Sequence, residues 1–400
     1  MDRQNMELEI SICRDIPIKY DYSKCEIQYL DFCDLKYNNF YEKYMLQNLP
    51  CIIKNVSNTW QCSVDWIKEG SINYEYLEQH YGDVVAPVAD CQETNFNSHC
   101  KTNMKVGDYI TYLRNPSKEK LLYLKDWHLK RLKSGEHFYE VPHIFASDWL
   151  NEFAIDHEDD DFMFVYIGAQ NTWTPLHADV YSSYSWSVNV IGRKKWVLFP
   201  PGEEEKLKDS LGNLPLLFNA HEFNNVRYIE VTQERGDAIF VPSGWHHQVC
   251  NELETISINH NFVNACNIHF VWEALQRNLI SVENEIKEFR ETPEFTSQCQ
   301  LILKSLFGMD FESFINFITY IATKRLSLRN NRQYIVFDMY NIGKNHIDND
   351  LLIIFKIIKC LLNHPLILDS HLPQNIAPTL INIRDQISDI IIKKSPEAKA

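Results

Sequence analysis

The stretch TPLHADVYSSYSWSVNVIGRKKW, residues 174–196, combines strand-like alternation with a histidine and an aspartate two positions apart. Residues i and i+2 of a β-strand leave the same face, so His177 and Asp179 point to one side and the residue between them points away. A second stretch, IFVPSGWHHQVCN at residues 239–251, supplies a further histidine, His247. Two imidazoles and one carboxylate on one face of a metal leave the opposite positions open, which is the donor set of non-haem Fe(II) oxygenases.

A histidine two residues before an acid is a weak signal by itself. With 15 histidines and 54 acidic residues in 400, about two such pairs are expected by chance, and the chain has three, at 157/159, 177/179 and 346/348. The first lies in the acidic run DHEDDD, which is typical of a solvated loop, and the third lies in the polar segment KNHIDND. Only the pair at 177/179 is followed by apolar, β-rich sequence and by a later histidine in a similar setting.

The pair belongs to a wider set of motifs: TPLHAD, GRKKWVLFPP at residues 192–201, GDAIFVPSGWHHQV at 236–249 and ISINHNF at 256–262. Together they resemble the JmjC domain of the 2-oxoglutarate-dependent oxygenases over about residues 50–262. The resemblance implies a double-stranded β-helix, a jelly roll of the cupin type. It also implies that His177, Asp179 and His247 hold Fe(II), and that 2-oxoglutarate and O₂ are the cosubstrates.

Two adjacent histidines, His246 and His247, compete for the third ligand position. Neighbours on a strand point to opposite faces, so only one of them can reach a given metal. The family pattern is Gly-Trp-x-His followed by a strand, and this register selects His247. His246 is then expected to pack beside the site.

The resemblance also implies which residues contact 2-oxoglutarate, whose distal carboxylate needs a cation inside the barrel. Lys194 matches the family lysine, and a buried lysine needs an acidic partner. Its neighbour Lys195 should face outward if the strand is regular. Thr174 matches a hydroxyl that joins Lys194 to a strand tyrosine, and Tyr123 in LLYLKDW stands at the position of that tyrosine. The competing interpretation of Tyr123 is a core tyrosine whose hydroxyl is satisfied.

Two further positions complete the expected cosubstrate site. Ser187 stands where some relatives carry an asparagine that assists 2-oxoglutarate, a departure that bears on one hydrogen bond and leaves the mechanism intact. Asn261 corresponds to an asparagine that faces the metal region in relatives. An equally simple role for Asn261 is a strand amide satisfied by backbone groups.

The substrate side offers three candidates. Trp173 and Trp186 flank the metal motif and could sheath the aliphatic stem of a substrate lysine. Asp126 in LKDWH is the candidate acid for the lysine ammonium. The competing interpretation is that both tryptophans belong to the core, which is their commoner role in a β-barrel.

The run YSWSVNVIGRKKWVLFPPGEEEKL, residues 184–207, is similar to one branch of the family. That branch is known for hydroxylating a lysyl side chain of the polypeptide release factor that ends translation, so the resemblance implies a protein lysyl hydroxylase with this partner. One alternative is a histone or protein N-methyl-lysine demethylase, although the chain lacks the Cys/His array of chromatin enzymes. Another is a non-catalytic barrel that serves as a binding module, against which the intact triad, Thr174 and Lys194 count.

The sequence divides into three parts and predicts a mainly β fold with added helices. Residues 1–48 form an α/β lead-in, and residues 49–264 form the catalytic region, with eight short strands in a barrel core of about residues 121–264. Residues 265–400 have helical spacing, with helices predicted over 270–290, 298–307, 311–325, 351–362 and 380–393. This helical region is expected to pack on the barrel or on a second copy of itself, which would make a homodimer.

Composition narrows the class of partner. A formal net charge of −15 argues against direct nucleic-acid binding and is compatible with a basic protein substrate. Neither a signal peptide nor a membrane span is indicated. Eleven cysteines without CxxC pairs indicate reduced thiols, so we expect a cytoplasmic protein that could also enter the nucleus. Cys91, His99 and Cys100 could be drawn as a zinc site, but a fourth ligand is missing.

Overall fold

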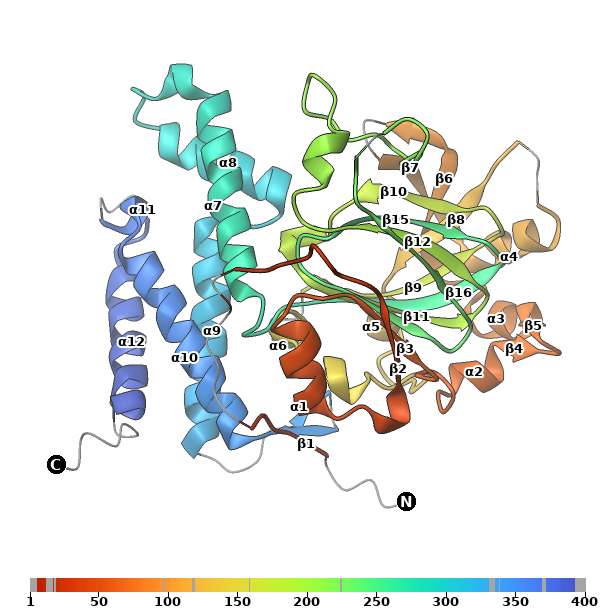
Figure 1. Ribbon diagram of the computed structural model, residues 1–400, viewed down its shortest axis with the longest axis horizontal. Coiled ribbons are helices and arrows are strands. Elements are labelled where there is room, and N and C mark those ends of the chain that lie inside the picture. The colour runs from red at the N-terminus through yellow and green to blue at the C-terminus, as the bar shows by residue number, and fades with distance from the viewer. Residues whose placement is uncertain are drawn as a thin grey trace.

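Two facing β-sheets form the centre of the computed structural model (Figure 1). It describes residues 6–11, 17, 19–95, 98–116, 119–157, 159–223, 225–330, 335–337, 339–368 and 372–392. Within these residues the smaller sheet has the order β10-β15-β12-β13, and the larger has the order β2-β3-β14-β11-β16-β9-β8-β6-β7.

Eight consecutive strands build the barrel. They are β9 (Met163–Gly168), β10 (Trp173–His177), β11 (Tyr184–Ile191), β12 (Lys194–Phe199), β13 (Ile229–Gln233), β14 (Ala238–Val241), β15 (His246–Asn251) and β16 (Thr255–Phe262). Strands β9, β11, β14 and β16 lie in the large sheet, and β10, β12, β13 and β15 lie in the small one. This distribution is that of a double-stranded β-helix, so the predicted fold class is confirmed.

Further strands extend the large sheet on both sides of the barrel. On one side lie β3 (Cys51–Lys54) and β2 (Gln28–Asp31), and on the other lie β8 (Leu122–Trp127), β6 (Val85–Asn95) and β7 (Ser98–Lys105). Strand β8 pairs with β9, so a segment far from the metal motif in sequence adjoins the barrel wall.

Alternation along the strands separates a polar inner face from an apolar outer face. The registers of β11 and β16 pair polar residues with polar residues: Ser185 with Asn261, Ser187 with Asn259, and Asn189 with Ser257. The residues between them, such as Val188 and Ile258, belong to the main apolar core on the other face of the sheet. A separate apolar cluster joins the two sheets: Ile52, Ile239 and Val241 come from the large sheet, and Trp196 and Leu198 come from the small one.

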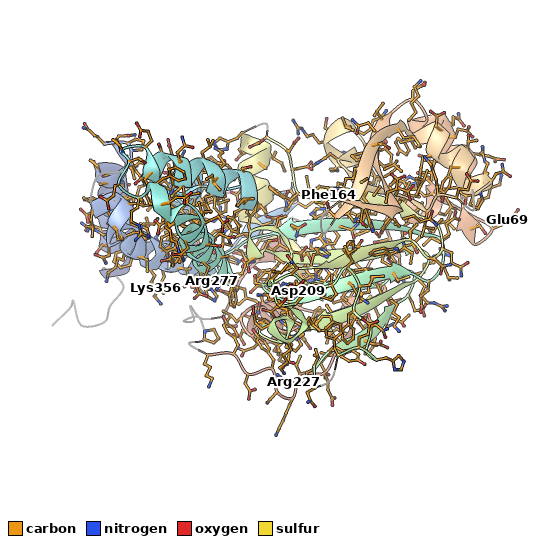
Figure 2. All side chains as sticks on the ribbon, turned by 90° about the horizontal axis from the view of Figure 1, so that it is seen from above. Glu69, Phe164, Asp209, Arg227, Arg277 and Lys356 are labelled. Atoms are coloured by element: carbon orange, nitrogen blue, oxygen red, sulfur yellow. The ribbon has the colours of Figure 1, made fainter. Side chains whose placement is uncertain are left out.

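Short helices accompany the sheets: α1 (Tyr37–Phe40), α2 (Cys62–Asp65), α3 (Tyr74–Tyr81), α4 (Val106–Arg114), α5 (Leu129–Leu132) and α6 (Trp149–Asp156). The C-terminal region contains α7 (Ile268–Glu285), α8 (Phe295–Phe307), α9 (Phe311–Asn330), α10 (Lys344–Leu362), α11 (Pro365–Leu368) and α12 (Ile376–Ile392). Figure 2 shows these helices, with Arg277 and Lys356, to one side of the barrel that carries Asp209. Among the helices that the structure describes, none is both long and apolar enough to cross a membrane.

The N-terminal segment is joined to the C-terminal region. Strand β1 (Met6–Leu8) pairs in parallel with β18 (Tyr340–Ile342), which in turn pairs with β17 (Ile335–Val336). The Tyr37 hydroxyl also lies 2.6 Å from Nε2 of His346 on α10. His346, which the sequence places in a polar segment, is fully buried in α10.

A buried charge cluster fastens the helical region to the barrel. Arg325 on α9 donates to both carboxylate oxygens of Glu152 on α6 at 2.9 Å, and its Nε donates to Asp350 on α10 at 2.8 Å. All three side chains are buried. Three helices thus meet around one guanidinium whose donors match planar carboxylates.

Candidate metal centre

The structure brings His177, Asp179 and His247 together on the inner face of the small sheet. One ligand atom from each residue lies within 4.8 Å of the others, and among the described residues this is the one such group of His, Cys, Asp or Glu. His177 on β10 pairs directly with His247 on β15, and their ring centroids are 4.4 Å apart. The separation of about seventy residues in sequence is therefore closed by a single strand pairing.

Backbone carbonyls select the tautomer of both imidazoles. Nδ1 of His177 lies 2.7 Å from the carbonyl oxygen of Pro175, and Nδ1 of His247 lies 3.0 Å from that of Trp245. A carbonyl can only accept, so Nδ1 carries the proton in each ring and the Nε2 lone pair is free for a metal. Burial, together with the neighbouring His247, lowers the pKa of His177 to about 4, which keeps this imidazole neutral.

The third donor is oriented by a hydroxyl. Ser185 Oγ donates to Asp179 Oδ2 at 2.6 Å, which leaves the other carboxylate oxygen for a metal. Asp179 and His177 are only partly buried, whereas His247 is buried. Two imidazole nitrogens and one carboxylate oxygen suit Fe(II), although Zn²⁺ or Ni²⁺ would also bind such a site.

His246 faces away from this group, as the predicted register requires. Its Nδ1 lies 3.7 Å from Glu204 on the outer side of the small sheet. Burial lowers the pKa of His246 to about 4. The alternation of β15 therefore separates the two histidines.

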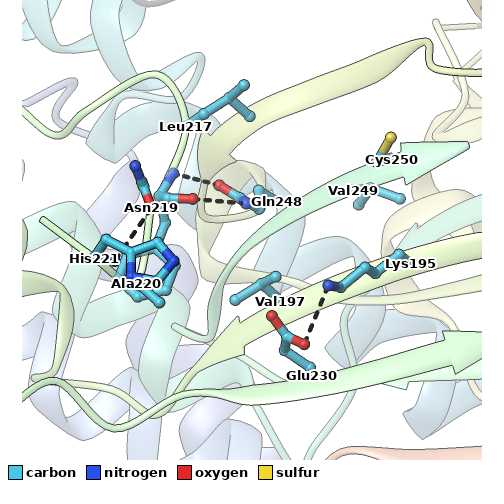
Figure 3. Close-up of a pocket in the computed structure, with 11 residues that line it drawn as sticks. Lys195, Val197, Leu217, Asn219, Ala220, His221, Glu230, Gln248, Val249 and Cys250 are labelled. Atoms are coloured by element: carbon cyan, nitrogen blue, oxygen red, sulfur yellow. Dashed lines mark hydrogen bonds and ion pairs between the residues drawn. The ribbon is translucent and has the colours of Figure 1, made fainter. Parts of the chain in front are cut away.

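The two adjacent lysines also point in opposite directions. Lys194 is 2% exposed inside the barrel, and its Nζ donates to Ser257 Oγ at 2.6 Å. Lys195 pairs with Glu230 at 3.1 Å and borders an outer hollow of about 330 Å³ under Leu217, as Figure 3 shows. This hollow lies on the far side of the sheet from the metal donors. Within the part of the chain described, no carboxylate lies within ion-pair distance of Lys194.

The surroundings of Lys194 destabilise its positive charge. Burial and the nearby Lys125 ammonium lower the pKa of Lys194 to about 7. A buried cation without an acidic partner is costly, and an anion bound beside it would remove that cost. The buried Lys194 ammonium thus fits one carboxylate of a small diacid.

Tyr123 and Thr174 lie at the same pocket. Tyr123 is 2% exposed and pairs across the sheet with Gly168, where an added Cβ would lie 2.7 Å from the Tyr123 ring. The Thr174 hydroxyl is joined to Lys125, whose Nζ lies 3.3 Å from Thr174 Oγ1. Gly168 thus makes room for the tyrosine. Thr174 Oγ1 accepts a hydrogen bond from Lys125, and the contact of Thr174 with Lys194 around the carboxylate stays a prediction.

Ser187 and Asn261 both lie on the inner face. Ser187 is buried, and within the described residues its hydroxyl has no hydrogen-bond partner, as is also true of the side-chain oxygens of Asn189 and Asn251. Asn261 donates from Nδ2 to Ser183 Oγ at 3.1 Å, so its amide is held by a side chain and not by the backbone. Unpartnered buried polar atoms on the inner strands fit a polar ligand in this barrel.

The substrate candidates are distributed differently from the prediction. Asp126 lies at the inner pocket, where it accepts from Tyr166 at 2.7 Å and from Lys101. Trp173 points away from Thr174 and packs edge-on against His99 of β7, with ring centroids 4.3 Å apart. Trp173 therefore lines the outer side of β10 near the barrel edge.

The structure does not bring Trp186 to the site. Its ring stacks on His260 at 4.0 Å and on Phe145 at 5.4 Å, within the main core. The neighbouring Ser185 bonds Asp179, and alternation then turns Trp186 to the opposite face. The expectation that Trp186 contacts substrate is corrected to a core role.

Three residues at the pocket were not predicted: Lys125, Tyr166 and Ser257. Lys125 and Tyr123 are two apart on one strand, so period-two alternation could have identified Lys125. Ser257 is part of the polar alternation in ISINHNF. Tyr166 gives no comparable local signal, because MFVYIG is apolar at most positions.

A barrel of two facing sheets with this donor set on its inner wall defines the cupin class of metal-dependent proteins. The family described as cupin-like domain matches residues 37–268. The 2-oxoglutarate and iron-dependent oxygenase JMJD4 homolog of Drosophila melanogaster is 41% identical over 83% of this chain and 87% of its own length. JMJD4 of Homo sapiens is 41% identical over 82% and 83%, and the arginine-specific demethylase JMJ20 of Arabidopsis thaliana is 35% identical over 74% and 70%. The chain belongs to the cupin-like JmjC family that these proteins represent.

Proposed function

We propose that this protein is an Fe(II)- and 2-oxoglutarate-dependent oxygenase that hydroxylates a lysyl side chain of the translation release factor. The observation that carries the proposal is that His177, Asp179 and His247 lie together on the inner face that also carries the buried Lys194. The relatives named as JMJD4 are described as 2-oxoglutarate and iron-dependent oxygenases. The release factor is proposed as the substrate because residues 184–207 resemble the branch that hydroxylates it.

The chain's own residues define the geometry of the reaction. His177, Asp179 and His247 would hold the metal, and Lys194, Thr174 and Tyr123 would hold the distal carboxylate of 2-oxoglutarate. When bound, Fe(II) with 2-oxoglutarate supplies the activation of O₂. In the balanced reaction one oxygen atom enters a C–H bond of the substrate, the other enters succinate, and CO₂ is released.

The residues around the site hold the metal donors in position and limit the access of solvent to Lys194. The two Nδ1–H bonds to carbonyls and the Ser185 bond to Asp179 hold the donors in place before the metal arrives. Low solvent access strengthens the pairing of Lys194 with a carboxylate. Ser187 and Asn261 place additional polar groups on the inner face.

Asp126 remains our candidate for recognition of the substrate ammonium. Burial opposes its charge, but Lys101 and Lys125 lower the pKa of Asp126 below its ordinary value, so it is ionised. It already accepts from the Lys101 ammonium, and the Lys101 side chain is 48% exposed. A substrate lysine can therefore replace Lys101 at this carboxylate.

The test combines three readouts. Purified protein with Fe(II), 2-oxoglutarate, ascorbate and the release factor should form succinate and add one oxygen atom to a lysine of the release factor, as peptide mass spectrometry would show. Asp179→Ala is the inactive control. Formaldehyde release from methylated peptides would instead indicate the demethylase chemistry that the name of JMJ20 describes. Binding of the release factor without succinate formation would indicate a non-catalytic module.

A further inference from the structure

A second buried lysine, Lys125, lies near Lys194, since both ammonium groups border the Tyr166 ring and the charge of Lys125 lowers the pKa of Lys194. Lys125 lies on β8, two residues after Tyr123, and is 8% exposed. Its Nζ lies 3.3 Å from Thr174 Oγ1 and 5.5 Å from the centre of the Tyr123 ring. It therefore stands between two of the three residues expected to surround the distal carboxylate.

The two lysines border the same aromatic ring. Lys125 Nζ and Lys194 Nζ lie 6.0 Å and 5.8 Å from the centre of the Tyr166 ring. A cation over an aromatic face gains some electrostatic stabilisation, but two ammonium groups in one buried pocket repel each other. The ring alone does not offset the cost of burying both charges.

The nearest acid is already engaged. Asp126 follows Lys125 in sequence, but its carboxylate oxygens accept from Tyr166 and Lys101, and φ of 55° at Asp126 turns the strand out of regular geometry. Within the described residues neither Lys125 nor Lys194 has a carboxylate within ion-pair distance. An anion that accepts from both lysines would satisfy the pocket.

We infer that Lys125 is a second basic residue for the distal carboxylate of the cosubstrate, which it binds together with Lys194 and Thr174. This inference rests on the proposed function, and it goes further by assigning specificity for a diacid to two cations on different sheets. A carboxylate has two oxygens and can accept from both ammonium groups. A ligand with an apolar end in place of that carboxylate would leave both lysines unpaired, and the pocket would reject it.

The experiment removes the positive charge from the protein by substitution of a lysine, and it removes the negative charge from the ligand by use of an analogue. Isothermal titration measures the affinity of the Mn(II)-loaded protein for 2-oxoglutarate and for 2-oxopentanoate, which has the same chain length with a methyl group in place of the distal carboxylate. The variants are Lys125→Met and Lys194→Met, with Lys195→Met on the outer face as the matched control. Mn(II) affinity and thermal unfolding are measured for every variant.

We expect Lys125→Met to weaken 2-oxoglutarate by about tenfold or more, since hydrogen bonds to charged groups are the strong ones. Its affinity for 2-oxopentanoate should stay within about twofold of wild type, because that ligand has no group for Lys125 to bind. Lys195→Met should match wild type for both ligands. Lys125→Arg should retain more 2-oxoglutarate affinity than Lys125→Met, because it keeps the charge.

Four outcomes would overturn the inference. Equal weakening of both ligands by Lys125→Met would place its effect at the metal end or in the local fold, and unchanged 2-oxoglutarate affinity would show that Lys194 suffices. If Lys125→Met does not fold, a loss of diacid preference in Lys125→Gln supports the inference and an unaltered preference opposes it. Failure of wild-type protein with Mn(II) to bind 2-oxoglutarate would refute the proposed function itself, and the inference with it.

Discussion

Replacement of Arg325 by methionine should weaken the attachment of the helical region to the barrel and leave the metal donors unchanged. The guanidinium is fully buried and bonds Glu152 through two nitrogens and Asp350 through a third. Methionine keeps an unbranched apolar side chain, ends near the position of the arginine Nε, and has no charge. The variant therefore leaves two buried carboxylates facing an apolar side chain.

The expected loss of unfolding free energy depends on the contacts that each carboxylate retains. Removing one partner of a buried ion pair costs about 3–5 kcal/mol, because the remaining charge stays desolvated. Glu152 keeps Lys324 at 3.0 Å, and Asp350 keeps Trp149 at 3.3 Å and His346 at 3.2 Å. These contacts soften the loss, so we expect the lower end, about 3 kcal/mol of unfolding free energy.

Urea unfolding followed by tryptophan fluorescence is the assay. With a denaturant slope of about 3 kcal/mol per molar, the midpoint of the transition should fall by about 1 M. The matched control is the triple variant Arg325→Met with Glu152→Gln and Asp350→Asn, which removes the uncompensated charges and should recover at least half of the loss. A single variant within about 1 kcal/mol of wild type would refute the reasoning that this cluster joins the three helices.

The remaining predictions concern the pocket. Asp179→Ala should abolish turnover and leave the unfolding midpoint near that of wild type, because the carboxylate orients toward the metal and Ser185; wild-type turnover with saturating Fe(II) would contradict its role as a ligand. His247→Ala should be inactive and His246→Ala at least partly active, as succinate formation would show, and the reverse result would mean that the register is wrong. Lys194 has a pKa of about 7, and a bound carboxylate would raise it. Affinity for 2-oxoglutarate should thus be nearly constant below about pH 7, where Lys194 is already protonated, and fall by up to about tenfold per pH unit above it, until the raised pKa is reached. Titration of the Mn(II)-loaded protein from about pH 6 to pH 9 measures this, and an affinity that does not change with pH would contradict it.

The barrel strands could be predicted because each has a local signal. Strand alternation with proline and glycine turns marked all eight of them in sequence. The predicted C-terminal helices also have counterparts, since amphipathic spacing is a local property as well. What no local pattern revealed is how the N-terminal segment reaches the far end of the chain, because the pairing of β1 with β18 joins residues more than three hundred positions apart.

The site was predictable where a motif stood on one strand and not where it depended on contacts between strands. His177 and Asp179 share one motif, so their common face followed from alternation. Alternation also turns Trp186 outward beside the inward Ser185, and its position near the metal motif in sequence gave the wrong expectation. The pairing of Lys125 with Thr174 depends on how β8 lies against the barrel, which the sequence of neither strand specifies.

The helical region does more than cover the sheet, because it contacts the turn that follows a metal donor. After Asp179 the chain passes through Tyr181 and Ser182 with φ of 56° and 55°, a left-handed conformation that side chains disfavour. Such a turn persists only where neighbours hold it. The Tyr181 ring packs on Phe307 with centroids 5.6 Å apart, and its hydroxyl donates to the carbonyl of Gly308 at 3.3 Å. The end of α8 therefore supports the backbone that carries Asp179, so helices outside the barrel help to set the geometry of a metal donor inside it.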